Sequence, residues 1–124
     1  MPGPFPYRAG FGPTPAPACD VVVSAAGQSI PLQGLLDTGA SQTTIPKALI
    51  ARLNLAKQGE GQAGGAFGPS KIIGLYVVDL EFLGLAFPNH PVFESDPDFV
   101  LIGRDILNRY TATFTGPLSQ FEIV

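Results

Sequence analysis

Proline and glycine interrupt this chain so often that they exclude an architecture of long helices. The sequence holds 15 glycines and 13 prolines among 124 residues, far more than an ordinary globular protein uses. Because proline cannot donate a backbone hydrogen bond and glycine weakens a helix interior, both favour turns between short elements. With 45% hydrophobic residues, the chain can still bury one core. We therefore expect one mainly β domain with frequent turns.

The prolines are unevenly distributed, and many lie at the start of the chain. Six of them fall within the first 17 residues. Because such a stretch cannot pair inside a sheet or continue a helix, we expect residues 1–18 to form an extended, flexible arm. An arm of this kind can be a polyproline ligand for another domain or an inert tail. The folded domain is then predicted to span residues 19–124.

Alternation of apolar and polar side chains predicts β-strands through most of that domain. In residues 72–83 the apolar members of the alternation share one face: Tyr76, Val78, Leu80 and Phe82. Shorter strands are expected at residues 20–24, 29–36, 43–45, 86–94 and 99–102, and in two segments after residue 109. Only residues 46–54, which begin with proline and carry an apolar stripe, and residues 104–109 favour a helix. The pattern predicts a barrel-like domain with one or two short helices.

Charge and residue counts argue against several classes of site. A net charge of −3 without a basic stripe argues against a nucleic-acid binder. One cysteine, Cys19, excludes an intrachain disulfide, and one histidine, His90, offers no zinc cluster, so we expect no metal or other cofactor. The longest apolar run, residues 72–78, is far too short to cross a membrane. No signal peptide is recognisable in the first residues, which favours a cytoplasmic location.

One short motif carries chemistry. Two leucines deliver Asp37 to the end of a predicted strand, and Thr38, Gly39 and Ala40 follow it. Downstream, a second apolar strand ends in Gly103-Arg104-Asp105. Between the two, residues 59–70 hold five glycines ahead of the long alternating strand. Asp-Thr-Gly alone is a weak signal, and the two further segments strengthen it.

With these three segments, the sequence resembles the retropepsin-like aspartic proteases, single-domain relatives of pepsin found in retroviruses and bacteria. The resemblance covers about residues 19–124 and implies a closed or partly open acid-protease barrel, active as a two-fold homodimer. It implies Asp37 as the catalytic residue, one from each chain. The other implied roles are support of the active-site loop by Thr38, Gly39 and Ala40, a substrate-binding flap at Gly64, Gly65, Ala66 and Phe67, and a structural signature at Ile102, Gly103, Arg104 and Asp105.

Two features depart from the retroviral pattern. In retroviral members the arginine often pairs with an acid shortly after the catalytic aspartate, whereas Ser41 and Gln42 occupy that region here. Candidate partners of Arg104 are therefore Asp105, a backbone carbonyl or the partner chain. The helix predicted at residues 46–54 is more similar to bacterial members.

The resemblance implies an aspartic endopeptidase acting on peptide or protein substrates. Peptide hydrolysis needs a base to activate water and an acid to protonate the substrate, and two adjacent carboxylates that share one proton supply both. The sequence holds one Asp-Thr-Gly, so the second carboxylate must come from another copy. Residues 119–124 would interleave with their mate at the dimer base. The alternatives are a catalytically weak or inactive dimerisation or peptide-binding module of the same fold, and a β-barrel interaction domain with a chance motif.

Two other patterns match known motifs only formally. Residues 59–64 fit G-x-G-x-x-G, but the predicted helix precedes them and a strand follows, the reverse of the order in nucleotide-binding proteins. Ser41 and His90 lack the setting of a catalytic triad, because no nucleophile elbow surrounds the serine and His90 falls in an expected edge strand. Cys19 fits a small buried apolar residue better than a nucleophile.

Overall fold

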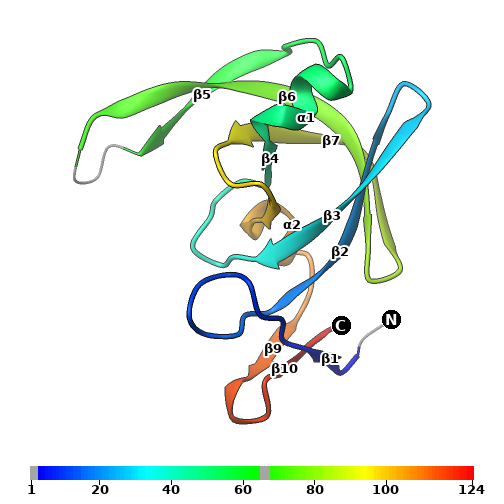
Figure 1. Cartoon of the computed structure of the whole chain (residues 1–124), viewed down its shortest axis with the longest axis vertical. Helices are drawn as coiled ribbons and strands as arrows, with labels where there is room; N and C mark the ends of the chain where they lie inside the picture. The colour runs from blue at the N-terminus through cyan, green and yellow to red at the C-terminus, as the bar shows by residue number, and fades with distance from the viewer. Residues whose placement is uncertain (1–2, 65–67) are drawn as a thin grey trace.

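A computed structural model of the chain describes residues 3–64 and 68–124 (Figure 1). Strands dominate it, and the two α-helices in the described ranges are short: α1 (Lys47–Arg52) and α2 (Arg104–Leu107). This confirms the mainly β fold with short helices. No helix in the part of the chain that is described has the length and apolar character to span a membrane.

Seven strands form one sheet that closes on itself. They are β2 (Ala18–Ala25), β3 (Gln28–Leu36), β4 (Thr44–Pro46), β5 (Gly59–Gly64), β6 (Ser70–Phe82), β7 (Leu85–Ser95) and β8 (Val100–Ile102). Their order is β2-β3-β8-β4-β7-β6-β5, and β2 also pairs with β6. Six strands therefore make a barrel, whereas β5 pairs only with β6. The hairpin of these two strands projects beyond the barrel (Figure 1).

A smaller sheet contains both ends of the chain. Its order is β1 (Phe5–Pro6), β10 (Gln120–Ile123) and β9 (Ala112–Thr115), with a 3₁₀ turn, η1 (Gly116–Leu118), before β10. β10 lies between the other two, but among the described residues β1 pairs only with Gln120 and Phe121 of β10. Interleaving of residues 119–124 with a partner's copy would compete with β1 for this edge, and it stays a prediction.

The proline-rich segment lies against the barrel rather than apart from it. Arg8 and Ala16 form an isolated antiparallel bridge, which closes a loop between β1 and β2. Arg8 also makes an ion pair of 2.7 Å with Asp20 in β2. These contacts belong to the described residues of the segment. The mobility of residues 1–18, and the domain boundary at residue 19, stay predictions.

The alternation of residues 72–83 is confirmed by burial. Tyr76, Val78, Leu80 and Phe82 are each at most 8% exposed, and they face the barrel interior with Val21 and Val23 of β2. Leu49 of α1 and Leu53 just after it close the same core, as the apolar stripe predicted. Full burial of an aliphatic or aromatic side chain contributes about 1.5–3 kcal/mol, so these contacts hold the barrel together.

The sequence predicted that His90 falls in an edge strand. This is wrong for β7 as a whole, because β7 lies between β4 and β6 in the sheet. The neighbouring proline is tolerated for a local reason. β4 pairs only with residues 93–95, so Pro91 has a paired strand on one side alone. The side chain of His90 points inward and is 4% exposed.

Candidate active site

Asp37 lies where β3 leaves the barrel beside β8. These two strands run parallel, with Leu36 opposite Ile102, and the Asp37 N–H donates to the Ile102 carbonyl at 2.9 Å. The pairing brings together two motifs that are far apart in the sequence, residues 37–40 and residues 102–105. The sequence singled out both segments, and the parallel pairing of the strands that lead into them places them side by side.

The residues after Asp37 fold back on its carboxylate. The Gly39 N–H donates to Asp37 Oδ1 at 2.9 Å, and the Ala40 N–H donates to the Asp37 carbonyl oxygen at 3.2 Å. A Cβ at position 39 would lie 3.1 Å from the same Oδ1, so glycine lets the carboxylate approach the backbone closely. Within the described residues, Oδ2 has no hydrogen-bond partner, and the side chain of Asp37 is only half-buried. One oxygen is therefore oriented and the other is free for chemistry.

Gly103 and Arg104 hold the loop of residues 37–40 in place. The Arg104 Nη1 donates to the Thr38 carbonyl at 2.8 Å, and the Arg104 N–H donates to the Ala40 carbonyl at 2.9 Å. Of the three candidate partners left open by the sequence, the structure identifies a backbone carbonyl. A Cβ at position 103 would lie 2.6 Å from the carbonyl carbon of Gln42, so only glycine fits at this contact.

A buried polar network lies under the same loop. The Thr43 hydroxyl donates to Asp105 Oδ1 at 2.7 Å and accepts the Gly103 N–H at 3.1 Å. Asp105 Oδ1 also accepts the Ile106 N–H at 3.0 Å, and Oδ2 lies 2.9 Å from Nε2 of His90. Thr43 is 0% exposed and the Asp105 side chain is 14% exposed. The network therefore ties β7, α2 and the segment before β4 to one carboxylate.

Two opposing effects determine the pKa of the Asp105 carboxyl. Burial by itself raises the pKa of this carboxyl, but the hydrogen bonds from His90 and Thr43 outweigh burial and hold its pKa below the ordinary value. Asp105 is therefore an anion that accepts hydrogen bonds, a structural role beside the catalytic loop.

The sequence analysis missed Thr43 and His90 as members of this network. Strict alternation from Phe87, which is buried, would place Asn89 inward and His90 outward. The register of β6 and β7 instead shifts between Val78 and Leu80, and the Asn89 N–H donates to Asp79 at 2.8 Å across the irregularity. This bulge turns His90 inward. His90 is the only histidine of the sequence and is easily noticed, but residue spacing does not identify Asp105 as its partner.

A cleft separates the loop of Asp37 from the projecting hairpin. It has a volume of about 390 Å³ and is lined by residues 39–42 and Thr44 on one side, by residues 62–64 and Ile73 on the hairpin, and by Phe93. Gly64, a predicted flap residue, ends β5 at this cleft. Gly65, Ala66 and Phe67 lie outside the described residues, so their roles stay predictions. Within the described ranges, no group of three potential metal ligands comes together.

Comparison with known proteins agrees with this geometry. A family model described as "gag-polyprotein putative aspartyl protease" matches residues 21–109. No curated protein sequence matches the chain. Among solved structures, the chain is similar to the foamy virus protease-reverse transcriptase bound to an RNA/DNA hybrid, with a TM-score of 0.55 and 26% identity, over 74% of this chain and 12% of that one. The chain therefore spans a small part of that viral protein.

A second solved structure is similar over nearly its whole length. It is the EIAV protease complexed with the inhibitor HBY-793, with a TM-score of 0.53 and 23% identity, over 82% of this chain and 93% of that one. At this identity the likeness shows a shared fold. It confirms the predicted barrel as that of a retroviral protease.

Proposed function

The chain belongs to the retropepsin-like aspartyl protease family, and on this premise we propose that it is an aspartic endopeptidase that acts as a homodimer. The observation that carries the proposal is the setting of Asp37: a half-buried carboxylate, oriented by the Gly39 N–H, whose neighbours Gly39 and Ala40 line a cleft beside a projecting hairpin. The sequence supplies one Asp-Thr-Gly, so a second copy must supply the other carboxylate across a two-fold axis.

The chemistry follows from bringing two carboxylates together. Two like charges at close range disfavour each other, so the pair holds one proton between its members. The ionised carboxylate takes a proton from a water molecule, whose oxygen attacks the carbonyl carbon of the peptide bond. The protonated carboxylic acid donates its proton to the carbonyl oxygen. When the tetrahedral intermediate collapses, a proton passes to the amine and the carbon–nitrogen bond breaks.

The bracing of the loop supports this chemistry. Proton transfer between the carboxylates and water depends on their positions to within a fraction of an ångström, and loose positioning reduces the rate. In this chain, Arg104 and Gly103 hold the backbone of the loop from below, while Thr38 is exposed at its tip. The exposed Thr38 is free to bond with the second copy, as the family resemblance implies.

The β5–β6 hairpin is suited to cover a bound peptide. It extends beyond the barrel, lines the cleft with residues 62–64 and, among the residues that the structure describes, leaves the other edge of β5 unpaired. A cover of this kind closes over substrate, excludes bulk water and offers backbone hydrogen bonds to an extended chain. We assign this hairpin as the flap.

Besides the interleaved C-terminal strands that the sequence suggested, the small sheet offers other edges for a dimer contact. Among the described residues of the small sheet, the two outer strands β1 and β9 each have one unpaired edge. A second copy can extend the sheet at one of these edges, or exchange its two-residue β1 with this chain. Either arrangement leaves β10 in place between its neighbours.

Cleavage of a denatured protein substrate tests the proposal. We expect wild-type protein to cleave at acidic to neutral pH, a statine-type transition-state mimic to inhibit it, and Asp37→Asn to lose activity while keeping its fold by circular dichroism. Cleavage retained by Asp37→Asn, or a monomer at every concentration by analytical ultracentrifugation, would contradict the mechanism. A dimer that binds peptides and cuts none would favour the inactive peptide-binding module.

A further inference from the structure

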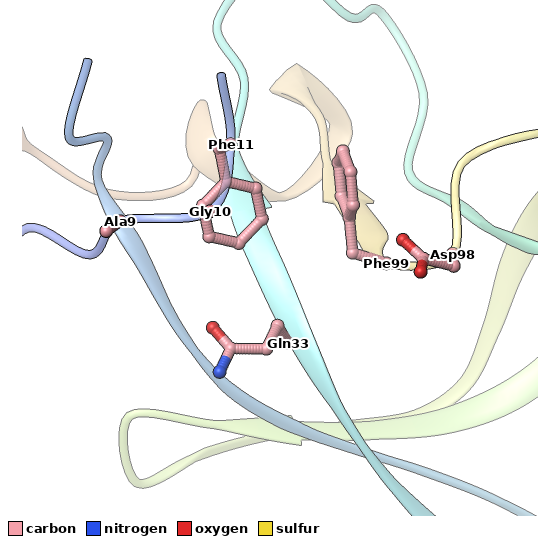
Figure 2. Close-up of a pocket in the computed structure, with 6 residues that line it drawn as sticks. All are labelled: Ala9, Gly10, Phe11, Gln33, Asp98 and Phe99. Atoms are coloured by element: carbon pink, nitrogen blue, oxygen red, sulfur yellow. The ribbon is translucent and has the colours of Figure 1, made fainter. Parts of the chain in front are cut away.

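A second pocket lies on the outer face of β3 and β8, beside the proline-rich N-terminal loop (Figure 2). Its volume is about 290 Å³. The lining residues come from that loop, from β3 and from the turn before β8: Ala9, Gly10, Phe11, Gln33, Asp98 and Phe99. Its wall on one side is therefore a segment outside the barrel strands.

Two sets of contacts hold this loop in place. Arg8 and Ala16 exchange two backbone hydrogen bonds of 2.8 and 2.9 Å at the base of the loop. At its middle, the Phe11 ring meets the Phe99 ring edge to face (Figure 2), and the ring centroids lie 5.0 Å apart. The loop is therefore anchored both to itself and to the barrel.

The pocket has an unbalanced negative charge. Asp98 is exposed and, within residues 3–64 and 68–124, has neither an ion pair nor a side-chain hydrogen bond. Its neighbour Asp96, in contrast, pairs with Lys47 at 2.8 Å and Lys71 at 3.1 Å. Arg8 lies nearby, but its charge is compensated by Asp20 at 2.7 Å.

This lining suits a long basic side chain. Lysine and arginine carry a charged head that a free carboxylate attracts, and apolar stems that pack on aromatic surface. Phe11 and Phe99 supply that surface, and aromatic rings also attract cations. The amide oxygen of Gln33 is already engaged by Arg8 at 3.3 Å, so Asp98 is the acceptor for the charged head.

The pocket opens on the face of the barrel that carries Asp37. Along β3, Gly34 and Leu36 are buried, so Gln33, Leu35 and Asp37 point the other way. Leu101 of β8 stands opposite Leu35 in the register and is likewise half-buried. An apolar strip therefore joins the pocket to the catalytic aspartate. The four steps along the strand from Gln33 to Asp37 cover about 13 Å, a distance that an extended peptide also covers in about four steps.

We propose that this pocket binds a lysine or arginine side chain of the peptide substrate, three or four residues from the scissile bond. The proposal rests on the proposed peptidase function and names a substrate class for it. Because a two-fold dimer carries two such pockets, basic residues are favoured on both sides of the bond. Asp98 and Phe11 are then residues that determine specificity, and the N-terminal loop is part of the substrate-binding surface.

Cleavage-site profiling tests the proposal directly. The wild-type dimer is incubated with a peptide library made from a digested, denatured proteome, and mass spectrometry identifies every cut, which fixes the register. We expect lysine and arginine to be enriched about fivefold over glutamate at the third or fourth residue on either side. Asp98→Asn removes the enrichment and Phe11→Ala weakens it, whereas the matched control Asp96→Asn keeps it. Cleavage without this enrichment, or enrichment that survives in Asp98→Asn, overturns the proposal and leaves the peptidase function standing.

A binding measurement separates this proposal from the proposed function. Fluorescein-labelled decapeptide mixtures with arginine, leucine or glutamate fixed at one position are titrated into the Asp37→Asn dimer and followed by fluorescence polarisation. We expect the arginine mixtures to bind about fivefold tighter than the glutamate mixtures, with a preference that Asp98→Asn removes and high salt weakens. This result together with an inactive wild type supports the pocket and contradicts the peptidase. Equal binding of arginine and glutamate mixtures overturns the pocket whether or not wild-type protein cleaves.

Discussion

Removal of the Asp105 carboxylate is predicted to destabilise the fold strongly. The carboxylate accepts hydrogen bonds from Thr43 at 2.7 Å and from the Ile106 N–H at 3.0 Å, and lies 2.9 Å from His90. Asp105→Ala would leave the Thr43 hydroxyl and the His90 ring nitrogen buried without that partner. Each such loss costs about 1–3 kcal/mol, so we expect the free energy of unfolding to fall by about 3–5 kcal/mol. This is a large share of the stability of an ordinary small domain.

Asp105→Asn separates hydrogen bonding from charge in the same network. The amide oxygen can still accept from Thr43, and the amide nitrogen can donate to a neutral His90, so most of the contacts persist. We expect a smaller loss of about 1–2 kcal/mol. Urea denaturation followed by circular dichroism, at one protein concentration for all variants, measures both values.

The pH dependence of the same variants provides an independent measure. Although burial opposes it, hydrogen bonding from His90 and Thr43 lowers the pKa of Asp105 from its ordinary 3.8. The ionised carboxylate therefore adds stability that is fully present above about pH 4 and is lost as the pH falls through the lowered value. The free energy of unfolding should fall more steeply in wild type than in Asp105→Asn below pH 4. Other carboxylates cancel in this comparison, because both proteins contain them.

Asp98→Ala is the control, since Asp98 is exposed and takes part in no ion pair or side-chain hydrogen bond within the described residues. Its unfolding free energy should stay within about 0.5 kcal/mol of wild type. An Asp105→Ala protein within about 1 kcal/mol of wild type, or parallel pH profiles for wild type and Asp105→Asn, would refute the network as a source of stability.

Three further predictions concern two substitutions beside the site and the reactivity of the buried Cys19. Gly103→Ala places a Cβ 2.6 Å from the Gln42 backbone, so we expect a loss of several kcal/mol in urea denaturation and no cleavage; a stable, active variant would contradict the close contact. Burial raises the pKa of the Cys19 thiol to about 12, so it should react with a thiol reagent such as dithionitrobenzoate only after unfolding, and rapid labelling of the native protein would argue against that burial. Arg104→Met removes the bond to the Thr38 carbonyl, so kcat should fall about tenfold or more with KM little changed; an unchanged kcat would show that the loop needs no such brace.

Local chemistry was enough to predict most of the barrel. Alternation from Tyr76 to Phe82 placed the longest strand correctly, because one face of it is buried throughout. The apolar run before Asp37 and the one before Gly103 predicted strands, and β3 and β8 are those strands. Spacing alone does not predict that these two strands pair in parallel, because the pairing joins segments that are far apart in the sequence.

The parts that sequence reasoning missed depend on contacts between distant segments. A bulge in β7 rotates His90 inward, and no periodic pattern encodes a one-residue shift of this kind. Similarly, the proline content around Phe5 argued against a sheet, yet β1 needs only two residues to pair with the edge of β10. In both cases a local irregularity of one or two residues decides where a side chain or a segment lies.

The contacts around Asp37 imply that folding of one chain orients this carboxylate and that dimerisation adds the second one. Within a single chain, hydrogen bonds that involve Ile102, Gly39 and Arg104 already hold the loop of Asp37. The carboxylate is therefore oriented before a partner arrives, and dimerisation needs to supply only the second carboxylate. On the proposed mechanism, a dimer of one wild-type and one Asp37→Asn chain would be well ordered and inactive, so loss of activity in mixed dimers arises from missing chemistry rather than from a disordered site.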